Sequence, residues 1–202
     1  MNRQVEDIKA IREMMERSSK FQAINGLSLM WAGLIAVAGA TFAYFYLLRD
    51  PALTHFNQKQ ETLILLADAL FVLALAVGII TFLCWRKARK NHQLFFNPVT
   101  RRAAYNLLIP LATGGIFSLL LLYNGHVEFI ASSTLIFYGL ALINASKFTV
   151  SEIHWLGLGE ILCGLLAALC LHQGIYWWVL GFGALHIVCG GVMYFKYDKT
   201  KK

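Results

Sequence analysis

Six long apolar runs constrain what this chain can fold into. Each run is close to the roughly 20 residues that an α-helix needs to cross the hydrocarbon of a bilayer. The runs are continuous rather than alternating, and backbone groups in lipid must be satisfied within their own segment, so the runs predict helices. They cover residues 24–48, 62–85, 103–123, 127–145, 153–171 and 175–195. The sequence therefore predicts an all-α fold, a polytopic membrane bundle of six transmembrane helices.

The composition agrees with a membrane class. Of the 202 residues, 58% are hydrophobic and 14% are charged, which leaves little polar surface for a water-soluble domain. The formal net charge is +7, but the basic residues fall between the apolar runs instead of on one face, so nucleic-acid binding is not indicated. The four cysteines show no paired spacing in a loop, and we interpret them as free thiols. They are Cys84, Cys163, Cys170 and Cys189.

A charged, helix-favouring segment, residues 1–22, precedes the first run. Its apolar residues fall at three- and four-residue spacings, which places them in one stripe along a short amphipathic helix. The stripe comprises Val5, Ile8, Ile11 and Met15. Two interpretations remain open: a solvated helix lying over its own bundle, or a helix that docks a protein partner or a second copy. The predicted division is a cytoplasmic N-terminal helix at 1–22 and a transmembrane domain with a short cytoplasmic tail at 23–202.

The loops differ in their content of basic residues. Nearly all lysines and arginines lie in the N-terminal segment, the second and fourth loops and the C-terminal tail. The first loop holds only Arg49 and Lys59, and the third and fifth loops hold none. By the positive-inside rule the basic side is cytoplasmic, so both termini are predicted to be cytoplasmic.

Two ionisable residues stand out in the last two runs. Glu160 lies within the fifth run and His186 within the sixth, with a short connection at residues 172–174. Both helices of such a hairpin rise about 1.5 Å per residue, so the two side chains reach matching depth near the middle of the bilayer. Ionisable groups in hydrocarbon are costly and point to a functional site. We predict a polar centre at Glu160 and His186 that binds a ligand or handles protons. A purely structural pair, or separate partners for each residue, is the alternative.

Neighbouring residues extend this hypothesis in two ways. Asp68 lies in the second run about one helical turn nearer the outside than Glu160, so it either joins a polar route or faces the outer rim. Cys163 and Cys189 each follow one member of the pair by three residues, on the same helix face. Carboxylate, imidazole and two thiolates are ligands that suit zinc, although the two cysteines would lie roughly 8 Å apart along the axis. No other cofactor is predicted.

The third run contains Pro110, Gly114 and Gly115. Proline frees a carbonyl and the glycines loosen the helix, as in the broken helices of transporters, while an ordinary kink is the alternative. Gly33 and Gly39 in the first run, and Gly114 with Gly115 in the third, also predict close packing against another helix. No nucleophile elbow, phosphate loop, metalloprotease helix or haem-attachment motif is present, so the sequence does not favour an enzyme.

Three segments carry a likeness to other proteins: residues 14–21 (MMERSSKF), 136–147 (IFYGLALINASK) and 193–198 (MYFKYD). Along its whole length the chain resembles an uncharacterised family of small bacterial six-span integral membrane proteins with no assigned activity. The resemblance implies the bacterial inner membrane, and it implies nothing about mechanism.

The leading functional prediction is a protein that binds or transports a small solute or ion at the polar centre. The alternative is a membrane-embedded sensor or interaction partner that acts through its N-terminal helix, with structural charges in the core. Transport predicts a water-accessible cavity that reaches Glu160, whereas sensing predicts a sealed bundle. The expected partners are the lipid bilayer and, for the alternative, another protein or a second copy.

The topology is testable by cysteine labelling. A thiol introduced at Asn124 should react with a membrane-impermeant reagent added outside cells, and one at Asn91 should not, because the third loop is predicted outside and the second inside. Both are introduced into a chain without its native cysteines, and labelling of lysed cells shows that both thiols are reactive. The opposite pattern would reverse the assignment of every loop.

Overall fold

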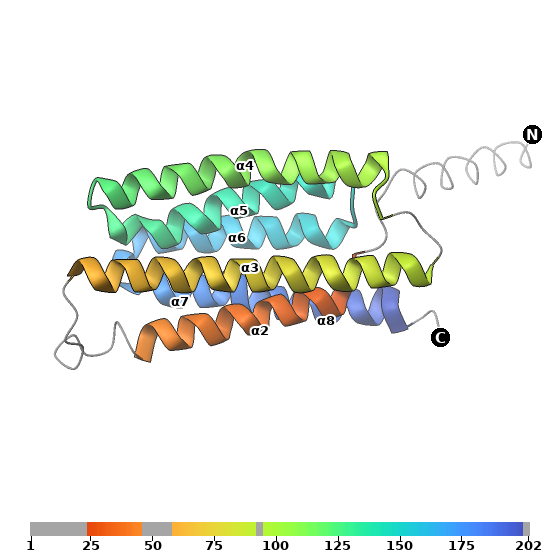
Figure 1. Cartoon of the computed structure of the whole chain (residues 1–202), viewed down its shortest axis with the longest axis horizontal. Coiled ribbons are helices and arrows are strands. Elements are labelled where there is room, and N and C mark those ends of the chain that lie inside the picture. The colour runs from red at the N-terminus through yellow and green to blue at the C-terminus, as the bar shows by residue number, and fades with distance from the viewer. Residues whose placement is uncertain (1–23, 46–57, 92–94, 200–202) are drawn as a thin grey trace, which may run out of the picture.

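Helices make up almost all of the chain that the structure, a computed structural model, describes: residues 24–45, 58–91 and 95–199 (Figure 1). The first five spans are α2 (Gly26–Ala43), α3 (Gln58–Lys90), α4 (Pro98–Tyr123), α5 (Ile130–Ser146) and α6 (Ser151–Leu169). The sixth span consists of α7 (Gly174–Trp178), the π-helical segment η4 (Val179–Leu185), α8 (His186–Met193) and the π-helical segment η5 (Tyr194–Asp198). Short 3₁₀ turns, η2 (Val127–Phe129) and η3 (Leu171–Gln173), precede α5 and α7. Within these residues the prediction of six helices long and apolar enough to cross a membrane is confirmed.

Two helices extend beyond the apolar runs that predict them. α3 continues to Lys90, five residues past the expected end, because its last turns are basic and favour the negative end of the helix dipole. α4 begins at Pro98, where proline suits the first helical turn. The side chain of Asn97 caps this helix by accepting a hydrogen bond of 2.8 Å from the Thr100 N–H. The second loop is therefore shorter than the sequence suggests.

The sixth span lies at the centre of the bundle. It packs against α2 on one side and against α6 and α5 on the other, and α6 in turn packs against α5. α3 packs mainly on α2, and α4 mainly on α5, so these two helices lie at the periphery (Figure 1). Their most apolar stretches are only 6% and 11% buried. The central helices bury the core, and the two peripheral helices present wide apolar faces to the surroundings.

Glycines allow the closest helix contacts. A Cβ added to Gly139 of α5 would lie 2.6 Å from the Gly157 carbonyl oxygen of α6, and one added to Gly157 would lie 2.8 Å from the Gly139 carbonyl oxygen. A Cβ on Gly33 of α2 would lie 2.7 Å from the carbonyl oxygen of Gly183. The close packing expected at Gly33 is confirmed, and small residues at such contacts are typical of membrane helix pairs.

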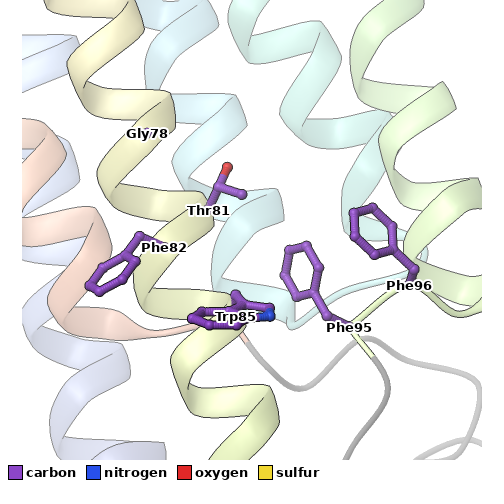
Figure 2. A pocket seen from close by; sticks show the side chains of 6 residues that line it. All are labelled: Gly78, Thr81, Phe82, Trp85, Phe95 and Phe96. Carbon is purple, nitrogen blue, oxygen red and sulfur yellow. The ribbon is translucent and has the colours of Figure 1, made fainter.

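A shallow apolar groove follows the outward face of α3 (Figure 2). Its lining comprises Gly78, Thr81, Phe82 and Trp85 from α3 and Phe95 and Phe96 from the segment before α4. We call it the α3 groove. It lies on the periphery of the bundle, away from the sixth span.

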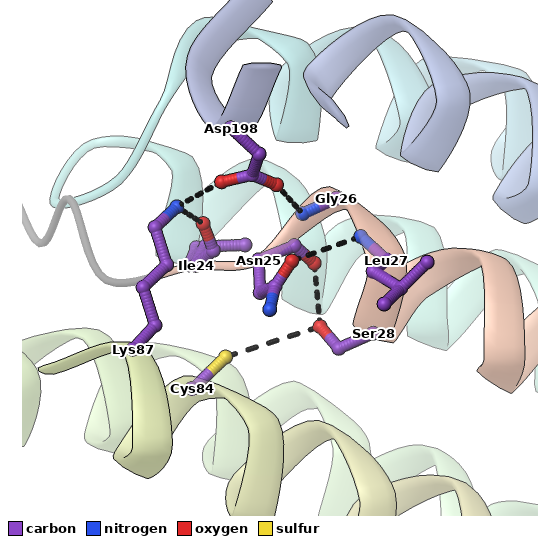
Figure 3. A network of polar contacts seen from close by, with 8 residues as sticks. All are labelled: Ile24, Asn25, Gly26, Leu27, Ser28, Cys84, Lys87 and Asp198. Atoms are coloured by element: carbon purple, nitrogen blue, oxygen red, sulfur yellow. Dashed lines mark hydrogen bonds and ion pairs between the residues drawn. The ribbon is translucent and has the colours of Figure 1, made fainter. Parts of the chain in front are cut away.

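Ion pairs tie helix ends together where α2, α4 and α6 begin and α3, α5 and the sixth span end. We call this the basic end. Lys87 of α3 contacts the Asp198 carboxylate at 2.6 Å and donates to the Ile24 carbonyl oxygen at 2.7 Å (Figure 3). The same carboxylate accepts a hydrogen bond of 3.0 Å from the Gly26 N–H, which starts α2. Three spans are thus joined at one end.

The reciprocal glycine contact is testable by a matched pair of substitutions. Gly139→Ala should lower the thermal unfolding temperature of the detergent-solubilised protein, because its Cβ meets the backbone of α6, and overpacking of this kind costs about 1–3 kcal/mol. Gly115→Ala on α4 is the control, since a Cβ there has no neighbour within 4 Å. Equal stability of the two variants would show that the α5–α6 contact is looser than described.

Candidate functional site

Glu160 and His186, the two residues predicted to form the polar centre, are in contact. Glu160 projects from α6, His186 opens α8, and the carboxylate Oε1 lies 3.2 Å from the imidazole Nδ1. Glu160 has none of its surface exposed, and His186 has 3%. The matching depth expected from helix rise is found, and the rotation of both helices turns the side chains toward each other.

The pair lies between two apolar clusters along α6. On the side of the basic end, Ile153 and Leu156 of α6 pack with residues of α2, α5 and α8. On the other side, Cys163 and Ala167 of α6 pack with Leu135, next to Trp177, Trp178 and Phe182. Both routes from the pair toward the ends of the bundle are therefore filled with apolar side chains in this structure.

The hydrogen-bond partners of His186 indicate which nitrogen of its ring carries a hydrogen. Nδ1 lies 3.2 Å from the carbonyl oxygen of Gly181, and Nε2 lies 2.9 Å from the hydroxyl of Tyr138 on α5. A carbonyl oxygen only accepts hydrogen bonds, so Nδ1 carries a hydrogen. In a neutral ring Nε2 then accepts from the Tyr138 hydroxyl, and in a charged ring it donates to it. The direction of the hydrogen bond between Nε2 and Tyr138 therefore differs between the neutral and the charged ring.

Tyr138 is a member of the site that sequence reasoning missed. It lies in the middle of its span, away from the membrane interfaces where tyrosine is usual. A tyrosine hydroxyl buried at that depth needs a hydrogen-bond partner, and this requirement is the signal that could have found it. Its ring also stacks on the His186 imidazole, with 5.5 Å between the ring centroids.

The π-helical segment η4 makes room for the Glu160 carboxylate. A Cβ added to Gly181 would lie 2.6 Å from Glu160 Oε2 and 2.5 Å from Leu135 Cδ2, so another residue here would make these side chains shift. π-helical turns inside α-helices are rare and occur frequently at functional sites. The irregular backbone therefore lies next to the ionisable pair, and its glycine lets the carboxylate approach the main chain of the sixth span.

The predicted helix break of the third run is not seen. α4 runs as one α-helix through Pro110, and this proline lies inside it. Gly114 faces Phe137 of α5, whereas a Cβ on Gly115 would meet no neighbour within 4 Å. Gly114 therefore serves helix packing, and Gly115 lies on the exposed face. The helix is continuous at both residues, so their backbone groups are not freed as they would be in a broken helix.

Neither oxygen of the Glu160 carboxylate has a hydrogen-bond partner among the described residues. Oε1 is close enough to Nδ1 for an ion pair, at 3.2 Å, but the geometry does not meet that of a hydrogen bond. We take the contact as electrostatic, because the Nδ1 hydrogen is directed at Gly181. An ionised carboxylate without hydrogen bonds is costly in a low-dielectric interior, so this group is stable as a carboxylic acid or beside an imidazolium.

The four residues considered for a metal are not brought together. The Cys189 thiol points to the Glu152 carbonyl oxygen at 3.7 Å, near the start of α6, while Cys163 lies in the apolar cluster with Leu135 and Ala167. The separation along the helix axes, expected from their positions, is the physical reason. In the ranges that the structure describes, no three His, Cys, Asp or Glu side chains form a metal-binding group.

The other predicted site residues lie elsewhere. Asp68 lies where α3 packs on α2: a Cβ added to Gly39 would be 3.6 Å from the Asp68 Oδ2. No contact between described residues joins it to Glu160 or His186. The stripe of Val5, Ile8, Ile11 and Met15 lies outside the described residues.

Comparisons of the chain with protein-family models, with curated proteins and with solved structures found no match.

The protonation of His186 is testable by NMR. In protein labelled with ¹⁵N-histidine, the neutral His186 ring should carry its hydrogen on Nδ1, because Gly181 requires a donor there. Tyr138→Phe should shift the Nε2 resonance and lower stability by about 1–3 kcal/mol, the usual cost of a buried group without its partner. Tyr123→Phe, at a residue 87% exposed, is the control. A hydrogen on Nε2 of the neutral ring would contradict the arrangement.

Proposed function

We propose that this chain is a multi-pass protein of the bacterial inner membrane, with both termini in the cytoplasm, that binds and transports an ion, the proton, at Glu160, His186 and Tyr138. The observation that carries the proposal is the contact between a fully buried carboxylate and a buried imidazole in the middle of apolar spans. Intramembrane ionisable residues that pair with one another are typical of proton pathways.

The proton suits this site better than a larger solute. Glu160 has no exposed surface, and apolar clusters fill the bundle on both sides of it. A proton needs no cavity, because it binds to a lone pair that is already present. The open oxygens of Glu160 and the Nε2 nitrogen of His186, next to the Tyr138 hydroxyl, supply such lone pairs.

Charge balance links proton binding to access. With one proton shared, the pair is neutral, either as acid and imidazole or as carboxylate and imidazolium. Without that proton the pair carries one negative charge, which is costly in a site closed to water. With its shared proton, the neutral pair can thus be enclosed in the bundle away from water. Without this proton, the pair needs water to stabilise its negative charge. This coupling is what a carrier needs in order to release its proton only when the bundle opens.

The sealed surroundings of Glu160 also favour the alternative function. In a membrane-embedded sensor or interaction partner, the same neutral pair would hold α6, α5 and the sixth span together without any transport. Its function would then depend on the N-terminal segment and on the protein or second copy that this segment binds.

Proton flux in liposomes separates the two functions. Vesicles that enclose a pH-sensitive dye and contain the wild-type protein should dissipate a pH gradient, and Glu160→Gln should reduce the rate to that of protein-free vesicles. Glu128→Gln changes a partly exposed carboxylate of η2 that lies 3.6 Å from His126, and it should retain the wild-type rate. Circular dichroism checks that each variant is folded. Wild-type vesicles without flux would end the transport proposal and leave the sensor.

A further inference from the structure

We infer that the α3 groove binds an anionic phospholipid, with an acyl chain along the groove and the phosphate at Arg89. The inference depends on the proposed insertion of the chain in a membrane, and it is independent of proton transport. The groove lies on α3, whereas the ionisable pair lies between α6 and the sixth span.

The groove has the shape and chemistry of an acyl-chain site. Gly78, Thr81, Phe82 and Trp85 recur at three- and four-residue spacings, so they form one face of α3. Phe95 and Phe96 stand across from this face, next to the start of α4 (Figure 2). The lining is almost wholly apolar, and its aromatic side chains remain exposed: Phe82 by 56%, Trp85 by 40% and Phe96 by 87%.

The groove ends at cationic side chains. Arg89 lies one turn beyond Trp85 on the same face, and its guanidinium is 5.0 Å from the centroid of the Trp85 ring. Other exposed basic residues flank this end, in the last turns of α3 and the first turn of α4: Arg86, Lys90, Arg101 and Arg102. The polarity changes along α3 from apolar to basic, as it does along a phospholipid from its acyl chain to its phosphate.

These cations differ from two nearby lysines, which carboxylates in the described part of the chain neutralise. Lys87, in the same turns of α3, pairs with Asp198 (Figure 3). Lys196 pairs with Glu152. Within the described part of the chain, no carboxylate pairs with Arg86 or Arg89. An unneutralised basic cluster beside an apolar groove attracts a headgroup of net negative charge more than a zwitterionic one, since each such residue adds to the attraction.

A second copy of the chain fits this surface less well. In a two-fold symmetric contact the same patch faces itself, so a dimer centred on the groove would bring Arg89 and its basic neighbours against their own copies. The charge that suits a lipid phosphate therefore opposes such a dimer.

Lipid retention measured by native mass spectrometry tests the inference. Protein extracted in a mild detergent is incubated with equal amounts of phosphatidylglycerol and phosphatidylcholine. Wild type should retain the anionic lipid in preference to the zwitterionic one. Gly78→Leu should lose the bound phosphatidylglycerol, because a Cβ at Gly78 has open space around it and the larger side chain fills the groove. Gly115→Leu places the same side chain in open space on α4 and should retain the lipid.

A second pair of variants tests the headgroup. Arg89→Gln should weaken the preference for phosphatidylglycerol, whereas Lys147→Gln removes an exposed cation between α5 and α6 and should leave it intact, and an equal preference in Arg89→Gln and wild type would overturn Arg89 as the phosphate site. Equal retention in Gly78→Leu and wild type would overturn the groove as the binding site, and equal retention of both lipids by wild type would overturn the anionic preference. A dimer that Gly78→Leu dissociates would assign the groove to a second copy.

The inference and the proposed function fail in different ways. Absence of the chain from the membrane fraction of cells would overturn both. A protein that moves protons in liposomes but retains both lipids equally would overturn the lipid inference alone.

Discussion

The burial of one carboxylate constrains the centre of this bundle. Glu160 has no exposed surface and no directed hydrogen bond among the described residues, so its charge must be balanced by a proton or by His186 at 3.2 Å. That requirement holds α6 and the sixth span in one register and one rotation. It also bears on the local backbone: η4 carries Gly181 past the carboxylate, and this glycine leaves room for it without a shift of the Glu160 side chain.

Close backbone packing makes the rest of the core compatible with this pair. Gly139 and Gly157 bring α5 against α6, and Gly33 brings α2 against the sixth span. Tyr138 on α5 then reaches His186, so a hydrogen bond joins α5 to the sixth span beside the ion pair with Glu160 of α6. Lipid gives little hydrophobic drive for helices to associate, and small residues at the contacts let dispersion forces and buried polar groups supply it.

The basic residues divide into two classes that the sequence does not distinguish. Lys87 and Lys196 pair with carboxylates and join helix ends, whereas Arg89 lies over Trp85 beside an open apolar groove. All of them count equally in the positive-inside rule. Their partners distinguish basic residues that join helix ends from Arg89, for which we infer a role in binding lipid.

The sequence by itself determined the helices and the depth of their ionisable residues. Six apolar runs of membrane length leave helices as the form that satisfies their backbone, and the helical rise sets the depths of Glu160 and His186 from residue number alone. The same arithmetic anticipated that Cys163 and Cys189 would be separated. Depth is a single coordinate along each helix, and it can be calculated from residue numbers and the helical rise.

Tertiary structure decided the remaining features of the site, because the length of an apolar run determines neither the rotation of a helix about its axis nor which helices pack against it. It placed the sixth span between α2 and α6, brought Tyr138 to His186 and left Asp68 against Gly39 of α2. It also put the irregular turn in η4 and not at Pro110, since the carboxylate of Glu160 needs space that a regular helix with a side chain at position 181 would fill.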